Sequence, residues 1–258
     1  MRPIAEFPAA IARRVRAVVT DVDDTLTHGA RLPADTYAAL ERLKAAGLIV
    51  IPASAAPSGW CDAWARMWPV DGIIGENGGL YFRHDPARGT TSRRYWLEEA
   101  ERRASRARLG DLASEVSLIV PGAATAHDDA YRETTLAMTA PPARMNDVIA
   151  AFRHAGARAT KNSLWALAWF GEFDKLAMIG RVLAADFALD IDAAREEIVY
   201  VGDSTNDGPQ FAFFPHSVGV ATVTRWLDTL EKPPEFVTAG PGGAGFVEVA
   251  NAILAARR

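Results

Sequence analysis

The run Val15-Arg16-Ala17-Val18-Val19 is followed, after one threonine, by the acidic turn Asp21-Val22-Asp23-Asp24-Thr25. A second apolar run, Ile198-Val199-Tyr200-Val201, leads into Gly202-Asp203-Ser204-Thr205-Asn206-Asp207. Apolar runs of this length, bounded by polar turn residues, predict buried strands of a parallel sheet. Because α/β sheets bind ligands at the carboxyl ends of their strands, we expect both acidic turns to open into one crevice.

Carboxylates gathered in such a crevice repel one another unless a hard cation lies among them, so the two turns together favour a divalent metal site. Acidic surface turns are the simpler interpretation of either motif alone, but the position of each motif directly after a strand favours the site. A helix-loop-helix calcium loop is excluded, because Leu26 and Leu32 occupy the positions that require glycine and glutamate.

Composition restricts the class of protein. The 258 residues suffice for one large domain or two modest ones, and the net charge of -4 argues against nucleic acid as the main partner. Cys61 is the only cysteine, which excludes an internal disulfide and a thiolate zinc site. There is no secretory signal pattern at the amino end and no apolar run of about 18 residues, so we expect a cytoplasmic chain without a membrane span.

The order of predicted elements indicates an α/β fold. Strand signals at residues 15–19, 48–51 and 73–74 alternate with helical spacing at residues 33–46 and 58–68. This alternation predicts a Rossmann-like parallel sheet with right-handed crossovers. The same pattern resumes with a helix at 174–186, the strand from Ile198 and a final helix at 246–257.

The intervening residues have a different character. Residues 83–108 are rich in arginine and show no buried strand pattern, although Glu98 and Glu99 precede Arg102 and Arg103 at the spacing of exposed helical ion pairs. Strand candidates follow at 132–138, 157–161 and 164–170, with a helix at 141–154. We therefore predict a core formed by residues 1–82 and 172–258, with an α+β cap domain inserted at 83–171.

Further polar residues suit phosphate chemistry. Asp21 and Asp23 are two positions apart on extended chain, so their side chains can face the same way. Ser54 follows the second strand, and Lys175 opens the helix after the insertion. A hydroxyl and an ammonium group neutralise a phosphate dianion, and a divalent ion reduces its repulsion of an attacking carboxylate.

These motifs resemble those of the haloacid dehalogenase superfamily of phosphatases. Asp21 to Thr25 is similar to its first motif, Ser54 to the second, Lys175 to the third and Gly202 to Asp207 to the fourth. An insertion between the second and third motifs resembles the type C2 cap. The segment Gly75-Glu76-Asn77-Gly78-Gly79 is similar to subfamily IIB, which includes sucrose-phosphate, mannosyl-3-phosphoglycerate and trehalose-phosphate phosphatases.

The resemblance implies a role for each matching residue. Asp21 would form an aspartyl-phosphate, and Asp23 would act as general acid and base. The phosphoryl oxygens would be held by Ser54, Lys175 and Asn206. The implied cofactor is Mg²⁺, with Asp21, Asp23, Asp203 and Asp207 as its metal-binding residues. One departure is Ser54-Ala55-Ala56, where many relatives have Thr-Gly-Arg, so an arginine contact to substrate is missing.

Substrate selection is expected to lie in the cap. The candidate substrate-contacting residues are Asn77, Arg132, Lys161, Asn162 and Trp169. A solvated surface or a packed cap core is the alternative interpretation for these cap residues, and Trp60, Trp64 and Trp68 recur at a spacing typical of helix packing. The glycine run from Gly240 to Gly245 lacks the acidic residue about 20 positions later that a dinucleotide site needs, so we interpret it as a turn into the last helix.

The expected function is Mg²⁺-dependent hydrolysis of a small phosphomonoester, most plausibly a sugar phosphate. Two alternatives stay open. A phosphomutase of the same superfamily would share the catalytic residues, and a non-catalytic sugar-phosphate sensor would bind without turnover. The expected partner is a small-molecule substrate, with no nucleic acid and no membrane, and the sequence does not determine the oligomeric state.

Overall fold

The strand that precedes the first acidic turn, β2 (Ala17–Thr20), lies inside a parallel sheet of the core. The computed structural model describes residues 1–161 and 165–257. Within them this sheet has six strands, in the order β1-β13-β12-β11-β2-β3. The other strands are β1 (Arg2–Pro3), β3 (Ile49–Pro52), β11 (Ile198–Gly202), β12 (His216–Gly219) and β13 (Phe236–Val237). Val19 lies between Ile51 and Tyr200 in the register, so the strands that carry the two acidic motifs are neighbours.

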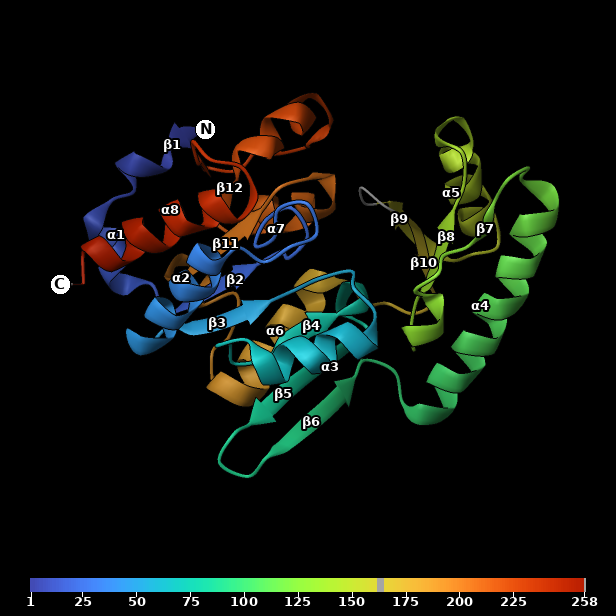
Figure 1. Cartoon of the computed structure of the whole chain (residues 1–258), viewed down its shortest axis with the longest axis horizontal. Helices are drawn as coiled ribbons and strands as arrows, with labels where there is room; N and C mark the ends of the chain where they lie inside the picture. Colours follow the sequence, from blue (N-terminus) through green and yellow to red (C-terminus); the bar gives the residue numbers. More distant parts are fainter. Residues whose placement is uncertain (162–164, 258) are drawn as a thin grey trace.

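Helices cover both faces of this sheet (Figure 1). One face packs against α2 (Ala34–Ala45) and α8 (Gly242–Ala255), with α1 (Ala9–Arg14) beside them. The other face packs against α6 (Lys175–Phe187) and α7 (Gly208–Phe213). Alternate residues of β2 explain the two layers, since Val18 packs with the first set of helices and Val19 with the second.

The glycine run begins α8, as expected for a turn into the last helix. The helix starts at Gly242, four residues before the expected start at Phe246. A Cβ atom at Gly243 would lie 2.1 Å from Oγ1 of Thr36, so glycine permits the close approach of α8 to α2. The sequence-based prediction put the start of this helix at Phe246, its first large apolar residue, because the preceding glycines have no side chains that contribute to a hydrophobic pattern.

A second sheet is antiparallel and extends the core. The strand at residues 73–74 was expected in the parallel sheet, but it pairs antiparallel in this second sheet and meets the end of β3 only through an isolated bridge between Ala53 and Ile74. It consists of β4 (Ile73–Gly75), β5 (Leu80–Asp85) and β6 (Thr90–Tyr95), with α3 (Ser58–Met67) packed on it. No strand was predicted at β6, because it is an edge strand with mostly polar residues that are exposed or only partly buried. The expected boundary after residue 82 falls inside β5, whose pairing with β6 continues to Tyr95. We therefore propose that the inserted unit begins after Tyr95.

The inserted unit is an α+β layer beside the core (Figure 1). Its antiparallel sheet has the order β7-β8-β10-β9, formed by β7 (Ala124–Thr125), β8 (Leu136–Thr139), β10 (Ala166–Trp169) and β9 (Arg158–Lys161). Two helices, α4 (Glu99–Ile119) and α5 (Met145–His154), cover one face. On the other face Ala137 and Leu167 pack against Ala55 of the core. The predicted fold class, a parallel-sheet α/β core with an inserted α+β unit, is confirmed.

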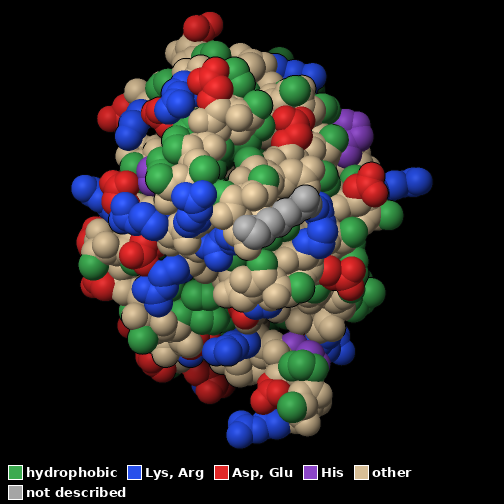
Figure 2. Space-filling view, turned by 90° about the vertical axis from the view of Figure 1, so that its left-hand side faces the viewer, with side chains coloured by type: hydrophobic (Ala, Val, Ile, Leu, Met, Phe, Trp, Pro, Cys, Tyr) green, Lys and Arg blue, Asp and Glu red, His purple; other side chains and the backbone are tan. Residues whose placement is uncertain are grey.

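Seven short 3₁₀ segments complete the described chain: η1 (Ile4–Glu6), η2 (Glu76–Gly78), η3 (Asp129–Tyr131), η4 (Pro142–Arg144), η5 (Arg195–Glu197), η6 (Thr205–Asp207) and η7 (Ala221–Thr229). No helix in the described ranges is long and apolar enough to cross a membrane. On the face shown in Figure 2, basic and acidic side chains are interspersed rather than separated into large patches of one sign.

Candidate active site

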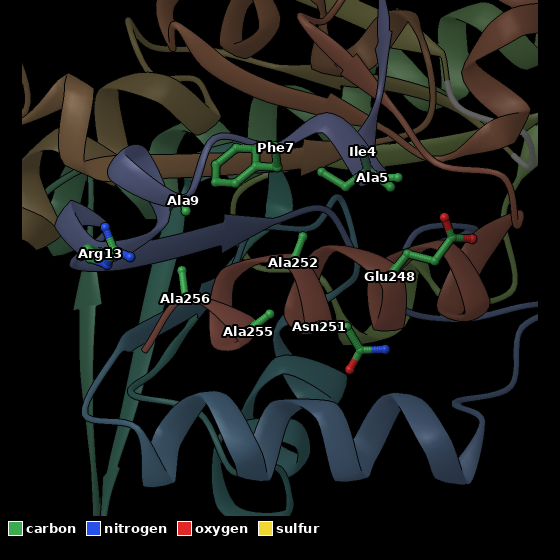
Figure 3. Close-up of a pocket in the computed structure, with 10 residues that line it drawn as sticks. All are labelled: Ile4, Ala5, Phe7, Ala9, Arg13, Glu248, Asn251, Ala252, Ala255 and Ala256. Atoms are coloured by element: carbon green, nitrogen blue, oxygen red, sulfur yellow. The ribbon is translucent and has the colours of Figure 1, made fainter. Parts of the chain in front are cut away.

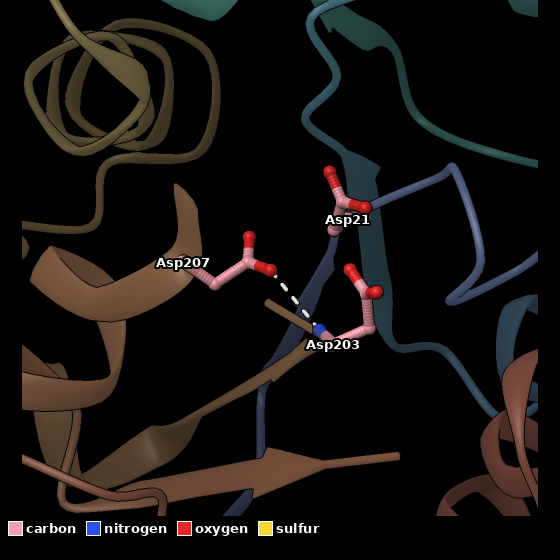
Figure 4. Close-up of side chains that lie close together, drawn as sticks. All are labelled: Asp21, Asp203 and Asp207. Carbon is pink, nitrogen blue, oxygen red and sulfur yellow. Dashed lines mark hydrogen bonds between the residues drawn. The ribbon is translucent and has the colours of Figure 1, made fainter. Parts of the chain in front are cut away.

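Three carboxylates converge where β2 and β11 end. Asp21 follows β2, whereas Asp203 and Asp207 lie on the turn after β11. One carboxylate oxygen from each residue lies within 4.8 Å of the others, and Figure 4 shows the three groups pointing toward a common space. The backbone N–H of Asp21 donates to the carbonyl of Val201 at 2.8 Å, which fixes the two turns relative to each other. The structure therefore brings together the two acidic motifs.

Asp207 is fully buried, and both of its oxygens are engaged by protein donors. Oδ2 accepts from the backbone N–H of Asp203 at 3.0 Å and of Ser204 at 3.2 Å. Oδ1 accepts from the hydroxyl of Tyr200 at 2.6 Å. Tyr200 was not among the predicted site residues, because a tyrosine in a buried strand has the same pattern as a core residue. Asp207 thus holds the shape of the turn on which Asp203 stands.

Lys175 is the cation of this cluster. Its ammonium group lies 2.5 Å from Oδ1 of Asp21 and 3.3 Å from Oδ1 of Asp207. The residue is buried at the amino end of α6, whose N-cap Asp174 accepts a hydrogen bond from Ala177 N at 2.9 Å. Burial disfavours the charged ammonium, but Asp21 and Asp207 outweigh that effect and raise the pKa of Lys175 above its ordinary value.

Burial and mutual repulsion dominate the electrostatics of the carboxylates. Burial raises the pKa of Asp21 well above its ordinary value, Lys175 opposes this, and Asp207 and Asp203 add to it. Burial, followed by repulsion from Asp207, raises the pKa of Asp203 to about 7. Burial also raises the pKa of Asp23. Because one lysine does not balance these charges, the cluster fits a further hard cation such as Mg²⁺, which prefers carboxylate oxygens.

The second motif lies beside the first. The Ser54 hydroxyl donates to Oδ2 of Asp23 at 3.3 Å and accepts from the backbone N–H of Ala56 at 2.9 Å. Arg132, from the inserted unit, donates to the carbonyl of Ala55 at 2.9 Å. A guanidinium group therefore does approach the second motif, but it comes from a distant segment of the chain and contacts the backbone.

A strained turn between β4 and β5 of the core forms hydrogen bonds with the inserted unit. Glu76 and Asn77 have positive φ angles of 49° and 56°, and a Cβ atom at Gly78 would lie 2.1 Å from the Asp174 carbonyl oxygen. The buried Glu76 carboxylate accepts hydrogen bonds from the backbone N–H groups of residues 133, 134 and 135. Both polar atoms of the Asn77 amide are buried and have no partner within the described chain. The turn thus leaves one buried amide unsatisfied close to the second motif.

A crevice of about 310 Å³ opens over the carboxylates. Its lining includes Asp21, Asp23, Asp203, Asn206 and Lys161. Another hollow, of about 560 Å³, lies between the amino-terminal segment and α8 (Figure 3). It is lined mainly by alanine and other apolar side chains and contains none of the predicted site residues. Asp21, Asp23, Asp203 and Asn206 therefore face this crevice, whereas Ser54, Lys175 and Asp207 lie behind its lining.

The residues predicted to contact the substrate from the cap lie in different parts of the structure. Lys161 lines the crevice, and Thr160 beside it donates to Oδ1 of Asn206 at 3.4 Å. Trp169 is buried, donates from its indole N–H to the Phe173 carbonyl at 2.9 Å, and does not line the crevice. Arg132 is also buried, in an ion pair of 2.9 Å with Asp128. Asn162 lies outside the described residues. Of the four substrate candidates that the structure describes, Lys161 lines the crevice, whereas Asn77, Arg132 and Trp169 do not.

No protein-family model and no curated protein sequence matches this chain. Solved structures do resemble it along nearly its whole length. A protein from Thermoplasma acidophilum is 22% identical, with a TM-score of 0.71 and coverage of 93% of this chain and 98% of that one. A putative HAD/COF-like hydrolase from Plasmodium vivax is 15% identical, with a TM-score of 0.71 and coverage of 97% and 100%.

The C-terminal domain of the C. albicans trehalose-6-phosphate phosphatase is 12% identical, with a TM-score of 0.68 and coverage of 99% of both chains. These similarities extend over the core and the inserted unit together. The chain therefore has the fold of the haloacid dehalogenase-like hydrolases, with an inserted α+β unit between its second and third motifs.

Proposed function

We propose that the protein is a Mg²⁺-dependent phosphatase that hydrolyses a small phosphomonoester, with a sugar phosphate as the preferred class of substrate. The observation that carries this proposal is the convergence of Asp21, Asp203 and Asp207 at adjacent strand ends, with Lys175 paired to Asp21 and Asp207. The similar solved structures, which include a trehalose-6-phosphate phosphatase, support it.

Asp21 is the proposed nucleophile. Its carboxylate attacks the phosphorus atom, the bond to the leaving oxygen breaks, and an aspartyl-phosphate forms. Asp23 gives a proton to the leaving alkoxide and then accepts one from the attacking water. The backbone hydrogen bond from Asp21 to Val201 and the contact between Ser54 and Asp23 hold the two carboxylates in place for these steps.

Ser54, Lys175 and Asn206 are the proposed ligands of the phosphoryl oxygens. A lysine that neutralises Asp21 in the free protein can shift part of its interaction to the incoming phosphate dianion. Asp21 and Asp203, together with the carbonyl of Asp23, are the proposed holders of Mg²⁺, with Asp207 orienting their turn. When bound, Mg²⁺ reduces the repulsion between the attacking carboxylate and the anionic phosphoryl group.

The test is phosphate release across a panel of sugar phosphates, nucleotides and phosphoglycerates, with Mg²⁺ and with excess chelator. The proposal requires inorganic phosphate to accumulate in step with substrate loss, and chelation to stop turnover until Mg²⁺ is restored. Full activity in chelator would overturn the metal assignment. An isomeric sugar phosphate with constant free phosphate would establish a mutase, and binding without any turnover would establish a sensor.

A further inference from the structure

The crevice continues past the carboxylates to a segment that the proposed chemistry does not use. Thr222, Arg225 and Trp226, all from η7, line it on the core side, and Lys161 lines it from β9 of the inserted unit. These lining residues belong to none of the four motifs that the proposed chemistry uses for the phosphoryl group, so they are available to contact the alcohol half of a phosphomonoester.

Arg225 is exposed and forms no hydrogen bond or ion pair with any other described residue. Among the residues that the structure describes, the Lys161 ammonium donates to one acceptor, the neutral amide oxygen of Asn146, at 3.3 Å. In contrast, the partly buried Arg106 and the buried Arg132 pair with Asp129 and Asp128, respectively. The crevice therefore presents two cationic side chains, one from each unit, that no carboxylate of the described chain neutralises.

Two other lining residues suit an organic ligand. The Oγ1 atom of Thr222 is shielded from solvent and has no hydrogen-bond partner in the part of the chain that the structure describes. Trp226 lines the crevice and follows Arg225 in the chain, and 39% of its surface is exposed to solvent. An unsatisfied hydroxyl and an uncovered aromatic ring beside a free guanidinium group are features of a site that a ligand completes.

We propose that Arg225 and Lys161 form a subsite for a second anionic group on the leaving alcohol. This inference rests on the proposed phosphatase function. The transferring phosphoryl group already has Lys175, Ser54 and Asn206, whereas a guanidinium fork matches a carboxylate or a second phosphate in bidentate geometry. The substrate class is thus a small phosphomonoester whose alcohol carries a second acid group, with Trp226 against its carbon chain.

The test compares matched substrates that differ in that group. D-3-phosphoglycerate and sn-glycerol 3-phosphate differ by a carboxylate, and fructose 1,6-bisphosphate and fructose 1-phosphate differ by a phosphate. The wild-type protein should have the higher kcat/KM for the acidic member of at least one pair, and the pair that responds identifies the acid group. Equal kcat/KM values within both pairs would overturn the subsite.

Arg225→Gln should lower kcat/KM about ten- to a hundredfold for the member that carries the second acid group. The kcat/KM of the member without that group should stay nearly unchanged. Arg225→Lys should retain part of the preference, because it keeps the charge and loses the fork. The matched control is Arg195→Gln, which removes the same charge from an exposed arginine of η5 outside the crevice. Equal losses on both members, or none on either, would overturn the proposal.

A binding measurement separates this inference from the proposed function. Calorimetric titration of D-3-phosphoglycerate or fructose 1,6-bisphosphate into Asp21→Asn needs no turnover. Adding Arg225→Gln to that variant should raise the dissociation constant of either ligand about ten- to a hundredfold, the same factor as expected for kcat/KM. If the wild-type protein releases no phosphate but binding depends on Arg225, the phosphatase function fails and the subsite stands. If binding is unaffected by Arg225→Gln, the subsite fails whatever the activity.

Discussion

The hydroxyl of Tyr200 donates to Oδ1 of Asp207 at 2.6 Å, and both side chains are fully buried. The same oxygen lies 3.3 Å from the Lys175 ammonium. One carboxylate oxygen therefore connects β11 to the amino end of α6, the first helix of the core after the inserted unit. This relationship makes a strand tyrosine part of the support for the candidate active site.

Tyr200→Phe should remove that hydrogen bond and keep the ring packing against Phe214. We expect the free energy of unfolding to fall by about 1–3 kcal/mol, the usual cost of losing a buried hydrogen bond to a charged group. Urea unfolding measures it. Tyr37→Phe is the control, because its hydroxyl contacts a backbone carbonyl at an exposed position. Unchanged stability of Tyr200→Phe would show that the hydroxyl does not support Asp207.

Asp21→Asn should reduce steady-state phosphate release at least about a thousandfold, because an amide is not a nucleophile. The amide has nearly the same shape, so circular dichroism should show an intact fold. Asp111→Asn on the exposed face of α4 makes the same chemical change away from the crevice and should retain full activity. Appreciable steady turnover by a folded Asp21→Asn protein would exclude Asp21 as the nucleophile.

The raised pKa of Asp203 predicts how stability depends on pH in chelator. Its pKa is about 7 when folded and 3.8 for the free side chain, so between these values the folded state holds a proton that the unfolded state has lost. This group's stabilising contribution is therefore complete below about pH 4 and is lost as pH rises to about 7. Thermal unfolding should show a decline in this window for the wild-type protein relative to Asp203→Asn.

Mg²⁺ should reverse that loss above pH 7 in the wild-type protein, because a bound cation favours the charged carboxylates. The Asp203→Asn variant should respond less. If the two proteins follow the same curve in chelator and gain equally from Mg²⁺, Asp203 is neither the titrating group nor a metal ligand.

Glu76→Gln should destabilise the protein by at least about 2 kcal/mol. The Glu76 carboxylate accepts from backbone N–H groups on both sides, at Ser58 with 3.0 Å and at Thr134 with 2.7 Å. In glutamine one of the two acceptor oxygens is replaced by an NH₂ group. In either orientation of the amide this NH₂ group would face a backbone N–H donor that it cannot accept from. Glu133→Gln is the control, since its carboxylate is partly exposed and accepts from the Tyr95 hydroxyl. Equal stability losses in the two variants would argue against a special role for Glu76.

The predictions of the strands β2 and β11 depended only on local sequence patterns, and the structure confirms both strands. The strands β2 and β11 are short β-branched runs, and their order along the chain placed Asp21 and Asp203 at one edge of a sheet. The polar edge strand β6 was missed, since Thr90–Tyr95 gains its structure from pairing with β5 rather than from a buried face of its own. Local patterns predict an element when its own residues supply the burial.

The sequence by itself determined the α/β class, the parallel strands β2, β3 and β11 and the acidic residues of the candidate site, because strand periodicity and turn chemistry are local properties. Only the tertiary structure decided which groups meet. It placed the Tyr200 hydroxyl on Asp207, buried Trp169 and Arg132 so that neither lines the crevice, and brought Arg225 and Lys161 into the lining of one crevice. Arg225 and Lys161 are far apart in the chain, whereas Tyr200 and Asp207 are only seven residues apart. Whether either pair comes together depends on how the sheets and helices pack, which local sequence patterns do not specify.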